Sequence, residues 1–132
     1  MPQARPDAVA LIILVVEDND LLREMFKKSF HSRHEVFTAA RAIEGWNLCL
    51  QKNPHIVFLD IGLPDASGHD LARRIKEWSP TTHVIMATAN DYEDDIEAAR
   101  RNRVDGFIVK PFSKEEITIC LDRYIALHQG TA

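Results

Sequence analysis

A short apolar run that ends in an aspartate, residues 56–60, constrains the fold of this chain more than any other feature. Such a run is typical of a strand buried on both faces, as in a parallel sheet covered by helices. Asp60 stands at the carboxyl end of this strand, and Pro64 and Gly68 then indicate a loop. Open α/β sheets bind ligands beyond the carboxyl ends of their strands. Asp60 is therefore either a loop or capping residue or part of a site, and the other strand ends decide between the two.

Four further apolar runs alternate with helical patterns along the rest of the chain. Strands are expected at residues 11–16, 36–37, 84–87 and 107–109, and helices beginning at about residues 20, 42, 67, 91 and 113. Short apolar strands joined by helical crossovers predict one parallel sheet with both faces covered and right-handed connections. The predicted fold class is therefore α/β, a doubly wound single domain.

Composition narrows the class of protein. The chain has 132 residues, the usual size of one domain, and its net charge of −4 offers no general attraction to nucleic acid or to an anionic membrane. The apolar residues 8–16 are too few for a membrane-spanning helix and lead directly into acidic residues, without the cleavage pattern of a signal peptide. We expect a flexible tail over residues 1–10, one domain over 11–128 and a C-terminal tail over 129–132.

Cysteine usage points to the cytoplasm. Cys49 and Cys120 match no metal-ligand spacing, and they read as small core residues of a protein in a reducing compartment.

Polar side chains follow four of the five expected strands. Glu17 and Asp18 follow the first strand, Asp60 the third, Thr88 the fourth and Lys110 the fifth. Because the carboxyl ends of parallel strands meet at one edge of a sheet, these side chains should lie together. Three crowded carboxylates repel one another, and Mg²⁺, which prefers a few carboxylate oxygens and several waters, relieves that repulsion. With a hydroxyl and a lysine nearby, the set suits phosphoryl transfer in which Asp60 is the nucleophile.

The motifs together resemble the receiver domain of two-component response regulators, the CheY-like family. The matching segments are residues 15–19, 59–64, 67–68, 86–89 and 106–112, within a resemblance that covers about residues 11–127. Each segment alone is weak, whereas all of them in order form a strong signal. The resemblance implies a flavodoxin-like (βα)5 fold with its five parallel strands in the order 2-1-3-4-5. In that fold the first and last helices cover one face of the sheet and the middle three cover the other, so no disulfide should join Cys49 and Cys120.

The resemblance also implies an acceptor and a metal site. Asp60 would accept a phosphoryl group from the phosphohistidine of a sensor histidine kinase or a phosphotransfer protein. Asp18 and Asp60 would bind Mg²⁺ directly, Glu17 would act largely through water, and Gly62 would offer its backbone carbonyl.

Further residues would contact the phosphoryl group or respond to it. Thr88 would donate its hydroxyl to the group and be drawn inward, and Lys110 would pair with a phosphoryl oxygen. The Lys110–Pro111 peptide bond would be cis. Phe107 stands where the family places a switch aromatic, often Tyr; without a hydroxyl it could respond only by ring packing, and a plain core role explains it equally well.

Output would use the fourth helix, the fifth strand and the last helix. Ile96, Arg100 and Phe107 would belong to this face, with Tyr124 along its edge. The partner would be a downstream protein or an effector domain outside this chain, and a phosphorylation-dependent dimer through the same face is compatible with the resemblance.

Three other interpretations compete with this one. Haloacid-dehalogenase phosphatases also form an aspartyl-phosphate, but they carry a second Asp two residues after the nucleophile, where this chain has Gly62. A dinucleotide-binding enzyme would need a Gly-rich turn where Glu17 and Asp18 stand. A degenerate receiver that binds without phosphorylation is disfavoured because all five site residues are present. We therefore expect a switch that catalyses only its own phosphorylation and dephosphorylation, not an enzyme with an external substrate.

The remaining polar residues have simpler explanations. His31 and His34 are expected on the solvated surface and His69 at an exposed helix start, and the histidines form no metal set. The three arginines within residues 100–103 suit the C-terminal end of a helix. Gly45 costs its helix about 1 kcal/mol relative to Ala, and its sequence context suggests no function.

Overall fold

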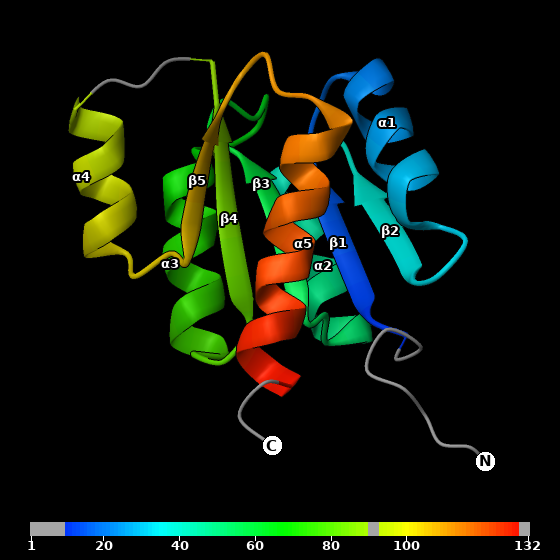
Figure 1. Ribbon diagram of the computed structural model, residues 1–132. Helices are drawn as coiled ribbons and strands as arrows, with labels where there is room; N and C mark the ends of the chain where they lie inside the picture. Colours follow the sequence, from blue (N-terminus) through cyan, green and yellow to red (C-terminus); the bar gives the residue numbers. More distant parts are fainter. Residues whose placement is uncertain (1–9, 90–92, 130–132) are drawn as a thin grey trace.

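The computed structural model describes residues 10–89 and 93–129, in which a parallel sheet lies between two layers of helices (Figure 1). The strands are β1 (Ile12–Val16), β2 (Glu35–Ala39), β3 (Ile56–Asp60), β4 (His83–Thr88) and β5 (Gly106–Val109). The helices are α1 (Asp20–Phe30), α2 (Ala42–Lys52), α3 (Gly68–Trp78), α4 (Glu93–Arg101) and α5 (Lys114–Gln129). Strand order is β2-β1-β3-β4-β5 with every pair parallel, so the predicted fold is confirmed.

Parts of the expected chain lie outside the described residues. They are residues 1–9 of the expected N-terminal tail, residues 90–92 at the expected start of the fourth helix, and residues 130–132 of the expected C-terminal tail. Within the described part, β2 is longer than the expected residues 36–37. Thr38 and Ala39 extend the strand because they pair with Val15 and Val16 of β1. Neither residue continues the apolar run of Val36 and Phe37, so the sequence pattern does not predict this pairing.

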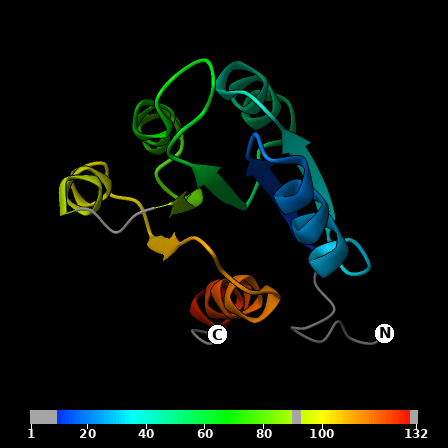
Figure 2. The same cartoon turned by 90° about the horizontal axis from the view of Figure 1, so that it is seen from above.

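The two faces of the sheet carry different layers (Figure 2). Helices α1 and α5 cover one face, and α2, α3 and α4 lie over the other. Successive strand residues alternate between the layers, so that Ile56 and Phe58 face α1 and α5 while Val57 and Leu59 face α2 and α3.

The cysteines follow this layering. Cys49 is buried on the α2 side, Cys120 packs on the α1–α5 side, and both are free thiols. The predicted absence of a bridge between them agrees with a sheet that separates them.

The structure supplies the reason for Gly45. It is buried where α2 crosses β1, and a Cβ added there would lie only 2.7 Å from Cγ2 of Val16. The small residue therefore lets the helix approach the sheet closely. Its neighbour Trp46 packs edge-on against Trp78 of α3, with ring centroids 5.8 Å apart, and the Arg74 guanidinium lies over its ring at 4.3 Å.

Two expectations about surface residues are wrong. His34 is half-buried, and its Nδ1 accepts a hydrogen bond from the backbone N–H of Leu11 at 3.0 Å. The ring therefore fixes the backbone just before β1 and is not a solvated surface group. Tyr124, expected along the edge of the output face, has a buried side chain. It is 6% exposed within the α1–α5 layer, where its ring lies 4.1 Å from that of His128 and 5.1 Å from that of His83.

Candidate functional site

The strand ends bring the predicted site residues to one edge of the sheet. Asp60 is the last residue of β3 and is paired in register with Ala87, and Thr88 follows as the last residue of β4. Lys110 comes directly after β5, and its backbone N–H donates to the Thr88 carbonyl at 2.7 Å. The parallel register therefore places these residues together although they are far apart in sequence.

Lys110 joins two of the acids directly. Its Nζ lies 3.0 Å from Oε1 of Glu17 and 3.4 Å from Oδ1 of Asp60. Glu17 is only 2% exposed and Asp60 6%, so both carboxylates are held out of bulk water. Buried carboxylates need a partner, and the lysine supplies one to each.

The acidic trio, Glu17, Asp18 and Asp60, has the arrangement of a cation site. Each residue offers one carboxylate oxygen, and the three oxygens lie within 4.8 Å of one another. All three ligand atoms are hard oxygens, and Asp18 is exposed, so that side of the site is open to water. This donor set fits Mg²⁺, which takes a few carboxylate oxygens and keeps several waters.

Burial and neighbouring charges shift the pKa values of Glu17 and Lys110. Burial raises the pKa of Glu17, and the charge of Asp60 adds to the rise, although the Lys110 hydrogen bond opposes it. Burial disfavours the charged form of Lys110, but its hydrogen bond to Glu17 and the charge of Asp60 outweigh burial and raise its pKa. The lysine therefore stays an ammonium and offsets only part of the negative charge.

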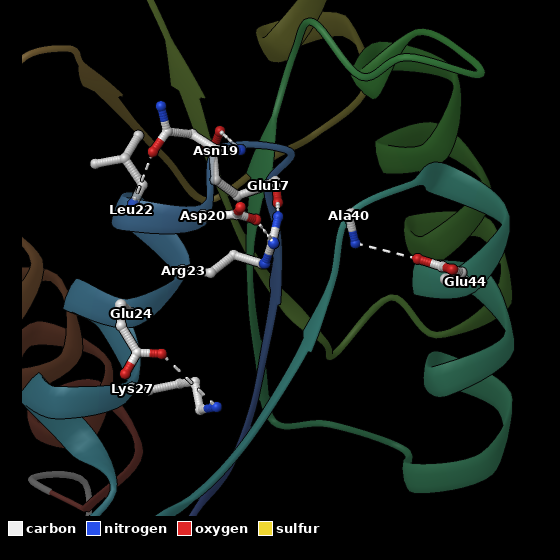
Figure 3. A network of polar contacts seen from close by, with 9 residues as sticks. All are labelled: Glu17, Asn19, Asp20, Leu22, Arg23, Glu24, Lys27, Ala40 and Glu44. Atoms are coloured by element: carbon white, nitrogen blue, oxygen red, sulfur yellow. Dashed lines mark hydrogen bonds and ion pairs between the residues drawn. The ribbon is translucent and has the colours of Figure 1, made fainter.

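The start of α1 holds Glu17 in place (Figure 3). The Asn19 backbone N–H donates to Oε2 of Glu17 at 3.1 Å, while the Asn19 side chain caps α1 by accepting from the Leu22 N–H at 3.0 Å. Arg23 donates through Nη1 to the Glu17 carbonyl at 2.7 Å and pairs through Nη2 with Asp20. Arg23 was not singled out from sequence, although its i,i+3 spacing from Asp20 is a signal for such a pair.

The loop between β3 and α3 is closely packed beneath Asp60. A Cβ on Gly68 would stand 2.1 Å from the Asp60 carbonyl oxygen, so only glycine fits there. The Gly68 N–H donates to the Ile61 carbonyl at 2.8 Å. Gly62, by contrast, is exposed with open space around its Cα, and its N–H lies 3.4 Å from Oδ1 of Asp60.

Asp65 extends this loop toward α2. Its two carboxylate oxygens accept the backbone N–H groups of Ala42 at 2.7 Å and Ile43 at 3.0 Å. These hydrogen bonds lower the pKa of the Asp65 carboxyl. The first turn of α2 is thus capped by a residue that lies 23 positions further along the chain.

The predicted switch residues lie on β4 and β5: Thr88 ends β4, and Phe107 of β5 pairs in register with Met86 of β4. Thr88 is buried, with 4% exposure, and Phe107 is half-buried against the core on the α2–α3 side. The Lys110–Pro111 peptide bond is cis. Ile96 and Arg100 lie on α4 and are not part of the acidic trio.

His69 is not the exposed residue that its position at a helix start suggested. Its side chain is 18% exposed, and Nε2 lies 3.1 Å from Oδ1 of Asp95 on α4. The contact spans 26 residues and has no local sequence signal.

Comparison with known proteins gives one consistent result. The protein-family model described as the response regulator receiver domain matches residues 13–122 of this chain. The probable transcriptional regulatory protein TcrX of Mycobacterium tuberculosis is 32% identical over 120 residues, covering 89% of this chain and 50% of that protein. The chemotaxis protein CheY of Halobacterium salinarum is 27% identical, covering 80% of this chain and 88% of that protein.

Structural comparison agrees in fold. The crystal structure of a CheY-like response regulator receiver domain protein from Methanospirillum hungatei superposes with a TM-score of 0.88 at 22% identity, covering 94% of this chain and all of that chain. The chain spans about half the length of TcrX, whereas it spans most of CheY.

Within residues 10–89 and 93–129, no helix combines the length and the apolar character needed to cross a membrane.

Proposed function

The chain belongs to the family of response regulator receiver domains, and on this premise we propose that it is a signalling switch whose phosphoryl acceptor is Asp60. Receiver domains of two-component systems are switches controlled by phosphorylation and not classical enzymes. The observation that carries the assignment of Asp60 is its place in the acidic trio within 3.4 Å of Lys110.

The proposed chemistry is one in-line transfer. The Asp60 carboxylate forms a bond to phosphorus while the bond from phosphorus to a histidine nitrogen of the donor breaks, and the freed imidazole keeps the electron pair. The Lys110 ammonium stabilises charge on the phosphoryl oxygens, and the Thr88 hydroxyl donates to one of them. The donor is a sensor histidine kinase or a phosphotransfer protein.

Mg²⁺ is the proposed cofactor. Asp18 and Asp60 would bind it directly, Gly62 would add its backbone carbonyl, and Glu17 would act through water because Lys110 and the Asn19 N–H already occupy its oxygens. Bound there, the ion would neutralise part of the charge on the phosphoryl oxygens.

Output is proposed to use α4, β5 and α5. Phosphoryl contact with Thr88 would bias two arrangements of the segment that follows β4, and Phe107 would respond by repacking its ring. The partner is a downstream protein or an effector domain outside this chain, in the cytoplasm, and a phosphorylation-dependent dimer through this face is part of the proposal.

Acetyl phosphate with Mg²⁺ tests the acceptor. Wild-type protein should gain one phosphoryl group by intact mass spectrometry, and Asp60→Asn should gain none, because the amide is not a nucleophile of this kind. Asp65→Asn is the matched control, since it removes a carboxylate from the same loop that is turned toward α2. Full labelling of Asp60→Asn at another residue would end the proposal.

Titration of Mg²⁺ tests the metal site. Asp18→Ala should weaken Mg²⁺ binding at least about tenfold, because few protein ligands are offered. Asp20→Ala serves as control, because that acid is paired with Arg23 and is not in the acidic trio. Equal Mg²⁺ affinity in Asp18→Ala and the wild type would contradict the assigned ligands.

A further inference from the structure

His69 is attached to the loop that carries Asp60. It is the second residue of α3 and follows Gly68, which packs against the Asp60 carbonyl with no room for a Cβ. Ser67 caps the helix by accepting the His69 N–H at 3.1 Å. A close-packed backbone contact therefore joins Asp60 to the residue that precedes His69.

The same residue is bonded to both ends of α4. Its Nε2 lies 3.1 Å from Oδ1 of Asp95 in the first turn, and its carbonyl accepts from Nδ2 of Asn102, just beyond the last turn, at 3.2 Å. We name these two contacts the α3–α4 latch. It joins the loop of the proposed phosphoryl acceptor to the helix of the proposed output face.

Apolar packing does little to hold α4. Ala99 is the one fully buried residue among those described on this helix, and it contributes only a methyl group. Hydrogen bonds at its two ends therefore account for a large share of its attachment. Figure 2 shows α4 at the margin of the molecule, beyond α3 and β5.

The imidazole is only half satisfied in this arrangement. Across the part of the chain that the structure describes, Nδ1 of His69 is the one buried side-chain nitrogen or oxygen without a hydrogen-bond partner. A buried polar atom without a partner is unfavourable, so an arrangement that wets or bonds Nδ1 would recover that loss. The latch is thus stable enough to form yet poised to open.

We propose that His69 is a positioning residue that sets how α4 responds to Asp60: its latch to Asp95 and Asn102 favours the unphosphorylated arrangement. The inference rests on the proposed function of Asp60. If the latch favours one arrangement, a phosphoryl group that favours the other must do work against it. Breaking the latch then strengthens binding of a phosphoryl analogue at Asp60, without any change in the residues that touch it.

Beryllofluoride with Mg²⁺ is the probe, and its affinity is measured by NMR titration. His69→Ala and Asp95→Ala should each bind it about fivefold more tightly than the wild type, and the double variant no more tightly than the singles. His69→Gln, whose amide N–H can replace that of Nε2, should stay close to wild type. Asp94→Ala is the matched control: it is an exposed acid one position away on the same helix.

A second readout separates coupling from a merely structural role. Without the analogue, the α4 amide signals of His69→Ala should shift along the line from free to beryllofluoride-bound wild type. Affinities equal to wild type, with only the melting temperature lowered, would overturn the latch while leaving the proposed function intact. Failure of the wild type to bind beryllofluoride at Asp60 would overturn both.

Discussion

Helices α1 and α4 resemble each other in charge but differ in what holds them. Both begin with acidic residues and end with basic ones, which suits the helix dipole. Helix α1 buries Phe26 and Phe30, which form an aromatic cluster with Phe58 of β3 and Phe112, with neighbouring ring centroids 4.9–6.4 Å apart. Helix α4 buries only Ala99 among its described residues and relies on the α3–α4 latch.

This difference in apolar burial between α1 and α4 indicates which side of the molecule can move. Apolar burial stabilises a helix in proportion to the area removed from water, and aromatic pairs add to that. A helix held by one buried methyl group, the half-buried Ile96 and a few exchangeable hydrogen bonds can change place at a much smaller cost. The chain therefore combines a rigid α1–α5 side with a loosely attached α4 next to the proposed acceptor.

The largest expected effect comes from the aromatic cluster. Phe58→Ala should lower the free energy of unfolding by about 3–5 kcal/mol, because it leaves a cavity against the rings of Phe26 and Phe30. Ile96→Ala on α4, where the side chain is only half-buried, should cost less than about 1 kcal/mol. Urea denaturation of the two variants measures both; comparable losses would break the contrast between the two helices.

Hydrogen exchange sharpens the comparison without mutation. Amides in the middle of α4 should open with a free energy at least about 2 kcal/mol below that of amides in α1, which corresponds to roughly 30-fold faster exchange after correction for intrinsic rates. Native-state exchange followed by NMR provides the values. Equal protection in the two helices would show that α4 is held by more than Ala99 and the latch.

The smallest expected effect is a pH dependence of the folding stability that comes from His34, on the α1–α5 side of the molecule. Burial lowers the pKa of His34, and the nearby Arg33 charge lowers it further. Since the unfolded chain takes up the proton near the ordinary pKa of about 6.5, this contribution to stability is complete above that pH and is lost as the pH falls below it. Urea midpoints measured between about pH 7.5 and about pH 5.5 should decline on acidification.

The variant His34→Asn isolates this contribution. Its amide oxygen can accept the Leu11 N–H that Nδ1 now accepts, and it does not titrate. The decline of the urea midpoint should be shallower in this variant. A slope as steep as that of the wild type would assign the acid sensitivity to other groups, of which His83 is the first candidate because burial also lowers its pKa.

The sequence by itself determined the sheet and the composition of the site. Short apolar runs alternating with helical patterns predict parallel strands, and parallel strands place their carboxyl ends on one edge. The positions of Glu17, Asp60, Thr88 and Lys110 at strand ends were therefore enough to predict that they lie together, and the structure confirms that Lys110 lies between two of the acids.

Tertiary structure alone decided the contacts between elements. The fit of Gly45 against Val16, the burial of Tyr124 and the bond from His69 to Asp95 depend on which surfaces the packed helices bring together. Periodicity reports the direction in which a side chain points from its own helix or strand, but not the partner that lies there. A histidine at a helix start reads as exposed until α4 packs beside it, because that contact joins residues 26 positions apart and leaves no local pattern in either.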